Sequence, residues 1–90
     1  MSQIHGDPQA IQQFALQLST FAQTSREHVM KLRGHLDQLG STTWTDHNHN
    51  AYKEEFTQII TQLNTLLLVL QEEQPAKLQH LAKLYMQVRV

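Results

Sequence analysis

The chain has 90 residues, 40% of them hydrophobic, a formal net charge of −1 and no cysteine. This length allows one domain, 1–90, and excludes an α/β enzyme with its own substrate domain. The near-zero charge argues against a nucleic-acid partner, and the missing cysteines exclude disulfides and zinc–cysteine sites.

The sequence predicts neither a cleaved signal peptide at the N-terminus nor a membrane-spanning segment. The first residues lack the basic stretch and roughly 7–15 apolar residues of a cleaved signal peptide. The longest aliphatic run, 66–70, is far shorter than the roughly 20 residues that cross a bilayer. We therefore expect no stable membrane insertion.

A long first helix is expected over 8–39. Asp7 is a good N-cap, and Pro8 fits the first helical position because its missing N–H is not needed there. Gly40 offers a left-handed stop. Apolar residues between them step by 3 and 4 alternately, which predicts a seam against a neighbouring helix. The stripe consists of Ile11, Phe14, Leu18, Phe21, Ser25, His28, Leu32, His35 and Leu39, widened by Val29 and Leu36.

A second helix is expected over 46–74. The connecting segment 40–46 supplies several caps, and Thr43 and Asp46 have the spacing of a capping box. The same 3-and-4 spacing follows, so we expect the second helix to fold back antiparallel on the first. Its stripe consists of Tyr52, Phe56, Ile59, Leu63, Leu66 and Leu70.

The tail after Pro75 has two interpretations. Proline lacks an N–H and its ring clashes with the carbonyl four residues earlier. Residues 76–88 are again amphipathic, so they form either a bent continuation of the second helix or a separate third helix. The tail carries Lys77, Lys83 and Arg89 and no acid. This charge favours packing against the acidic second helix.

The predicted fold class is thus all-α, an antiparallel helical hairpin. The aliphatic run 66–70 covers more of the helix circumference than one partner helix can hide. We expect a second hairpin, either another copy or a paralogue, to complete a four-helix bundle, the alternative being a third helix that folds back. The predicted interface residues are Phe56, Leu63, Leu66, Leu67 and Leu70.

Trp44, the only tryptophan, lies in the connection between the two helices. It is either a lid on the end of the hairpin or an anchor at a partner surface. In length, helical pattern and turn tryptophan the chain resembles the Trp-X-Gly (WXG, early secreted antigen-like) family, helical hairpins that are substrates of type VII secretion systems. The motif reads Trp44-Thr45-Asp46 here, so Asp46 replaces the glycine and is still able to cap the second helix.

The resemblance implies a non-enzymatic substrate or adaptor that acts as a dimer, with a secretion ATPase or a toxin cargo as further partners. It also implies a cytoplasmic protein that is exported without a cleaved signal peptide. The resemblance places the recognition element in the tail, at Tyr85. The family's acidic residue four positions later is Arg89 in this chain.

No residue pattern points to catalysis or to a cofactor. The nucleophile, phosphate-loop and Glu-x-x-His signatures are all missing. His47 and His49 converge on a metal only in extended backbone, since residues two apart on a helix point about 200° apart. His28 and His35 lie on the predicted seam, where a structural role outweighs a metal site or a pH sensor.

Two alternatives to the secretion hypothesis remain. The first is a filament or assembly subunit of another secretion apparatus, whose hairpins have a proline-rich turn in place of Trp44. The second is a metal- or proton-responsive bundle that depends on the six histidines.

Overall fold

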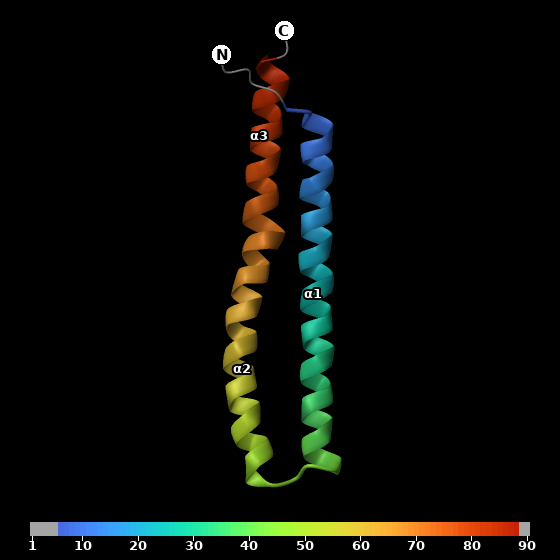
Figure 1. Cartoon of the computed structure of the whole chain (residues 1–90), viewed down its shortest axis with the longest axis vertical. Helices are drawn as coiled ribbons and strands as arrows, with labels where there is room; N and C mark the ends of the chain where they lie inside the picture. Colours follow the sequence, from blue (N-terminus) through green and yellow to red (C-terminus); the bar gives the residue numbers. More distant parts are fainter. Residues whose placement is uncertain (1–5, 89–90) are drawn as a thin grey trace.

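The computed structural model describes residues 6–88, and every regular element in that range is helical. Helix α1 (Pro8–Thr42) runs the length of the molecule. Helix α2 (His47–Leu68), the π-helical turn η1 (Val69–Glu73) and helix α3 (Gln74–Val88) return beside it (Figure 1). The hairpin is elongated, 67 × 19 × 18 Å. The predicted antiparallel all-α hairpin is confirmed.

Aspartate side chains start both long helices. Asp7 accepts a hydrogen bond from the Gln9 N–H, at 3.0 Å, and Asp46 accepts one from the Asn48 N–H, at 2.9 Å. Each bond satisfies a backbone donor that the first helical turn leaves free. The capping-box assignment is wrong, because Asp46 is itself the N-cap, whereas Thr43 is the C-cap of α1.

The predicted stop at Gly40 is also wrong. Helix α1 continues to Thr42, and no glycine in 6–88 has a positive φ. The last turn closes by other means, since the Ser41 and Thr42 hydroxyls both donate to the Gln38 carbonyl, at 3.0 and 2.8 Å. Thr43, the C-cap, keeps right-handed backbone angles. Gly40 therefore does not end the helix.

Pro75 is accommodated by a π-helical turn. The Gln74 N–H donates to the Val69 carbonyl five residues earlier, and Pro75 itself is buried. Such single-turn π segments occur inside α-helices. The chain keeps its direction through the turn, so α3 continues α2 and packs along α1 (Figure 1). The bent continuation is confirmed, whereas a third helix that folds back is wrong.

The predicted packing of the basic tail on the acidic second helix is wrong for the same reason. Because α3 extends α2 end to end, the two share no side, and α1 is the neighbour of both. The π-turn also carries a link across the hairpin. Arg26 Nη1 of α1 donates to Gln71 Oε1 at 2.9 Å.

The buried residues of the seam recur at multiples of seven along α1, and at steps of eleven, seven, eight and seven along the return. On α1 the buried residues are Pro8, Ala15, Ala22 and Leu36. On the return they are His49, Ile60, Leu67, Pro75 and Ala82. The step across the π-turn, from Leu67 to Pro75, is eight residues, so the extra residue keeps both segments facing α1.

The stripe predicted to form the seam of α1 lies mostly beside it. Phe14 and Phe21 are 54% and 59% exposed, whereas Ala15 and Ala22 are 1% and 0% exposed. Adjacent residues lie about 100° apart around a helix, so both sets cannot face α3. The alanines take the seam because their small side chains let two helices approach closely. His28, Leu32, His35 and Leu39 are exposed with the phenylalanines.

Candidate functional site

One side of the hairpin exposes large apolar side chains from both long segments. We call this set the apolar face. Its exposed fractions reach 63% at Leu66, and only Phe56 and Leu70 are half-buried. None of its twelve positions is Asp, Glu, Lys or Arg. The face comprises Phe14, Phe21, His28, Leu32, His35 and Leu39 of α1 together with Tyr52, Phe56, Ile59, Leu63, Leu66 and Leu70 of the return.

A groove near the turn joins the two halves of this face. It has a volume of about 240 Å³ and is lined by side chains from both helices. Because residues of α1 and α2 share the groove, the two stripes lie on the same side of the hairpin. Tyr52 and Phe56 stack along one wall, with ring centroids 6.1 Å apart. The lining residues are Leu32, His35, Leu36, Leu39, Tyr52 and Phe56.

Trp44 closes the turn end of the hairpin. Its backbone N–H donates to the Leu39 carbonyl at 2.8 Å, which fixes the residue just beyond α1. The indole is half-buried and meets the His49 ring edge to face, with centroids 5.3 Å apart. Tyr52 lies next to it at 6.1 Å. The tryptophan thus belongs to an aromatic cluster that continues into the groove, which is the arrangement expected for a lid.

His49 is a buried part of the turn rather than a free ligand. It is 5% exposed, and its Nε2 lies 2.7 Å from the Leu36 carbonyl oxygen, a distance at which a protonated Nε2 donates a hydrogen bond. Its imidazole occupies the space that a Cβ at Gly40 would fill. The role of Gly40 is therefore close approach, because only glycine lets the imidazole pack on α1 there.

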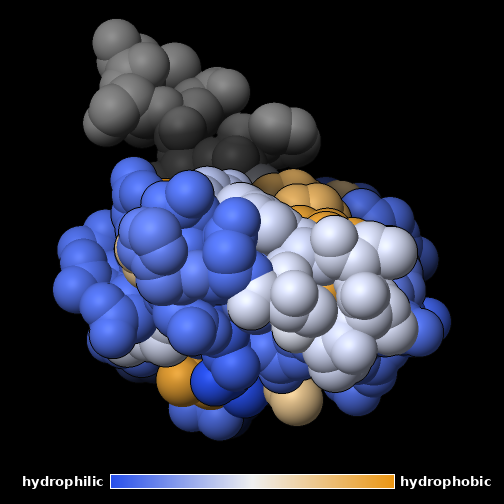
Figure 2. Space-filling view, turned by 90° about the horizontal axis from the view of Figure 1, so that it is seen from below, coloured by the Kyte–Doolittle hydropathy of each residue, from blue (hydrophilic) through white to orange (hydrophobic). Residues whose placement is uncertain are grey.

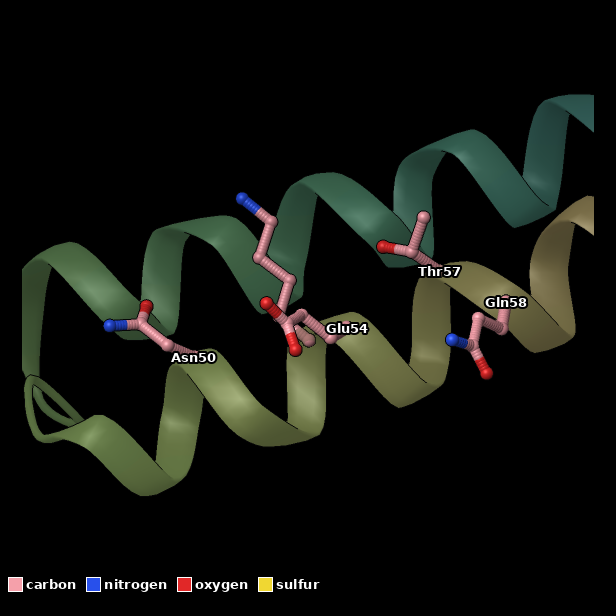
Figure 3. A pocket seen from close by; sticks show the side chains of 5 residues that line it. Asn50, Glu54, Thr57 and Gln58 are labelled. Carbon is pink, nitrogen blue, oxygen red and sulfur yellow. The ribbon is translucent and has the colours of Figure 1, made fainter.

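On the side of the hairpin opposite the apolar face, the turn half of α2 is polar. Figure 3 shows Asn50, Glu54 and Gln58 on successive turns of α2, each pointing outward along a shallow trough of about 520 Å³. Lys53 forms an ion pair with Asp37 of α1 at 2.8 Å. The hydrogen bond from Lys53 is the main cause that lowers the pKa of Asp37. The trough is lined by α2 alone, so it offers no enclosed binding site.

Seen from the turn end, the tip of the molecule is hydrophilic or near neutral, and hydrophobic residues appear at its margins (Figure 2). The tip is formed by residues 40–50, which include serine, threonine, asparagine and histidine. The contrast between the polar tip and the apolar side indicates that any apolar contact with a partner is made along the length of the hairpin.

The histidines do not converge. His47 is exposed in the first turn of α2, whereas His49 is buried against α1. His28 and His35 are exposed two helical turns apart on the apolar face, so they are not the partly buried seam residues that the sequence suggested. Within residues 6–88, no three side chains of metal-binding type are grouped.

The remaining predicted site residues divide between surface and core. Leu63 and Leu66 are exposed on the apolar face, and Leu67 is 5% exposed, buried in the seam within the hairpin. Tyr85 is half-buried, and its ring lies against the backbone of Gly6, where an added Cβ would come within 2.9 Å. Arg89, four residues beyond Tyr85, lies outside the described residues.

Sequence reasoning missed the residues that set the seam. Ala15, Ala22 and Ala82 carry almost no exposed surface, yet they attract no attention in a search for large apolar side chains. A signal was present, since Ala15 and Ala22 are seven residues apart, as are Phe14 and Phe21. The contact of Gly40 with His49 could not be predicted from the sequence, because the two residues lie on different helices and show no motif or periodic spacing.

None of the helices in 6–88 combines the length and apolar character needed to span a membrane.

Comparison with known proteins gives one match. No curated protein and no solved structure matches the chain. A family described as proteins of 100 residues with WXG matches residues 3–88, which include the two helices and the Trp44 turn. The chain therefore belongs to the WXG100 family of small helical proteins associated with type VII secretion.

Proposed function

We propose that this protein is a non-enzymatic interaction protein of a type VII secretion system, a substrate or adaptor that works as a homodimer of hairpins. The observation that carries the proposal is the exposed apolar face in a chain of the WXG100 family. A lone hairpin leaves this face in water, where burying it against a partner is worth about 25 cal/mol per Å² of apolar surface.

The size of the face suits a stable dimer. The face runs from Phe14 to Leu39 on α1, about 38 Å at 1.5 Å per residue, and crosses both helices of a hairpin 19 Å wide, so it covers roughly 700 Å². A standard protein interface buries about 800 Å² on each partner, whereas the largest apolar patch of a typical monomer is about 300–600 Å². The apolar face is thus large enough for an interface.

A second copy is the partner that fits best. An interface between two copies related by a twofold axis must be self-complementary. The twelve positions of the apolar face carry no charged side chain of the Asp, Glu, Lys or Arg type. Two copies therefore meet without burying like charges, and together they give the four-helix bundle that a hairpin with one seam lacks.

The dimer is tested with a matched pair of charge insertions. Leu66 and Leu16 are 63% and 69% exposed. Leu66 lies on the apolar face, whereas Leu16 is two residues beyond Phe14 and so about 200° around α1 from that face. We expect Leu66→Glu to sediment as a monomer and Leu16→Glu as a dimer, because only the first buries a charge in the interface.

Other outcomes of the sedimentation experiment distinguish the alternatives. A wild-type monomer that dimerises only when a paralogous hairpin is added would replace the homodimer by a heterodimer. Polymers that grow with concentration would favour the filament subunit instead. Equal behaviour of Leu66→Glu and Leu16→Glu would rule out the apolar face as the interface.

Export is tested in a cell that carries a type VII apparatus. We expect the protein in the culture medium only when the secretion ATPase is intact. Leu66→Glu should stay in the cytoplasm, while Leu16→Glu should be exported. Tyr85→Ala should reduce export and leave the dimer intact, because we assign recognition to the tail. Export of all three variants at the wild-type level would contradict the proposal.

A further inference from the structure

The segment in front of α1 and the last turn of α3 touch at one contact. Helix α1 begins and α3 ends at the same end of the molecule (Figure 1). There the backbone of Gly6, two residues before α1, lies against the ring of Tyr85. Both residues are half-buried. We call this contact the clasp, because it joins the start of the first helix to the end of the return.

The clasp is made on the face of the tyrosine ring. A Cβ at Gly6 would lie 2.9 Å from Tyr85 Cζ and 3.0 Å from each of the two Cε atoms. Nearly equal distances to three ring atoms place this Cβ over the ring face, since an approach from the edge would bring one atom much nearer than the others. Only glycine therefore lets the backbone pack so closely on the ring.

The position of Gly6 is fixed by the start of α1. Asp7, its neighbour, accepts a hydrogen bond from the Gln9 N–H at 3.0 Å and so caps the helix. Pro8 follows, with a φ angle fixed by its ring, and is buried in the seam. Gly6 is thus held on one side by two anchored residues. The Tyr85 side chain is the more mobile partner, because it rotates about its own χ angles.

We propose that the clasp is an autoinhibitory contact that masks the recognition element of the tail. This inference rests on the proposed function, in which a partner recognises Tyr85. A buried tyrosine ring contributes to binding mainly through its large apolar faces, and one face is already covered by Gly6. A partner and Gly6 therefore compete for the ring. The apparent affinity falls by the fraction of molecules in which the ring is free.

The first part of the test asks whether the clasp exists in solution. Protons above the face of an aromatic ring resonate upfield, so we expect upfield Gly6 Hα signals in the NMR spectrum of the wild type. They should return to ordinary values in Tyr85→Leu. Gly6→Ala should free the ring, because the added Cβ comes within 2.9 Å of it. Gly34→Ala is the matched control, since a Cβ there meets nothing within 4 Å.

The second part measures export in a cell that carries a type VII apparatus. If the ring is free in about one molecule in ten, Gly6→Ala should raise export by up to about tenfold where recognition is limiting. Gly34→Ala should be exported like the wild type. The double variant Gly6→Ala/Tyr85→Ala should be exported as weakly as Tyr85→Ala, because unmasking acts only through the ring.

The outcomes separate this inference from the proposed function. Ordinary Gly6 Hα signals in the wild type, or wild-type export of Gly6→Ala with a freed ring, would overturn the clasp and leave the proposed function standing. Gly6→Val repeats the test with a larger, branched side chain in case the ring stays shielded in Gly6→Ala. Wild-type export of Tyr85→Ala would overturn recognition through the tail, and the clasp with it.

Discussion

The two halves of the hairpin are held together by residues of different size. Where α1 meets α3, the seam consists of alanines, and Ala15, Ala22 and Ala82 are at most 1% exposed. Where α1 meets α2, larger side chains fill it, and Ile60 and Leu67 are 6% and 5% exposed. The backbones of α1 and α3 accordingly run closer together than those of α1 and α2.

This difference in seam residues explains why the apolar face has a different shape in the two halves of the hairpin. In the half near the termini, close approach on alanines leaves no room for Phe14 and Phe21, which lie exposed beside the seam. In the turn half, the wider spacing leaves a groove of about 240 Å³ between the helices. One half thus presents protruding rings and the other a depression. Both belong to the face that we assign to a partner.

The largest effect is expected in the turn half, on removing a large seam side chain. Leu67→Ala should destabilise the protein by about 2–4 kcal/mol, from lost burial plus the cavity left behind. Urea unfolding followed by circular dichroism measures the change. The control is Leu16→Ala, at a position 69% exposed, which should change stability by less than about 0.5 kcal/mol. Similar losses for both would mean that Leu67 is not in the core.

The half near the termini should respond to the opposite change. Ala22→Leu adds three carbons at a position with no exposed surface, facing α3. Forcing them into the seam should cost about 1–3 kcal/mol. Ala10→Leu, at an exposed position of the first turn of α1, should be nearly neutral, since both residues are good helix formers. If Ala22→Leu were as stable as Ala10→Leu, the close seam would be refuted.

The same contrast shows how far the sequence predicts the structure. The starts of both helices follow from Asp7-Pro8 and Asp46, because N-capping is a local interaction. The hairpin follows from the 3.5-residue period. The period does not say whether Phe14 or Ala15 faces the neighbouring helix, because both repeat after seven residues. Which of the two residues faces the neighbouring helix depends on how closely the two helix backbones approach each other. This distance is set by both helices together and is not encoded in the period of one.

The sequence spacing indicates which apolar residues belong near the candidate site, but not which of them are exposed and which are buried in the seam. Phe56, Leu63 and Leu66 were assigned to an interface from their spacing, and they lie on the apolar face. Leu67 was assigned with them and lies in the seam, because one residue along a helix turns the side chain by about 100°. In an aliphatic run such as 66–70, composition alone does not separate inner from outer residues.

Two glycines of α1 give a comparison within the turn half. A Cβ at Gly40 would overlap the His49 imidazole, whereas a Cβ at Gly34 would meet nothing within 4 Å. We expect Gly40→Ala to destabilise by about 1–2 kcal/mol, because the buried ring must move. Gly34→Ala should stabilise by about 0.5–1 kcal/mol through helix propensity. Thermal melts of the two variants should move in opposite directions, and a shift of the same sign would contradict the role of Gly40.

The smallest effect concerns the ion pair that spans the polar side of the turn half. Because Lys53 lowers the pKa of Asp37, the pair stabilises the folded state above the unfolded pKa of about 3.9, and this contribution disappears as the pH falls through the lower native value. Asp37→Asn should therefore melt slightly below the wild type at neutral pH and match it in strong acid.

The exposed position of the ion pair sets the size of this effect and the way to recognise it. Both side chains are well exposed, 39% for Lys53 and 46% for Asp37, so salt should shrink the difference at neutral pH. Glu54→Gln removes an exposed acid from the same side, and no ion pair involving Glu54 occurs within 6–88. An equal loss in Glu54→Gln would assign the effect to net charge. A loss confined to Asp37→Asn would show that even the wide half of the hairpin is joined across its polar side.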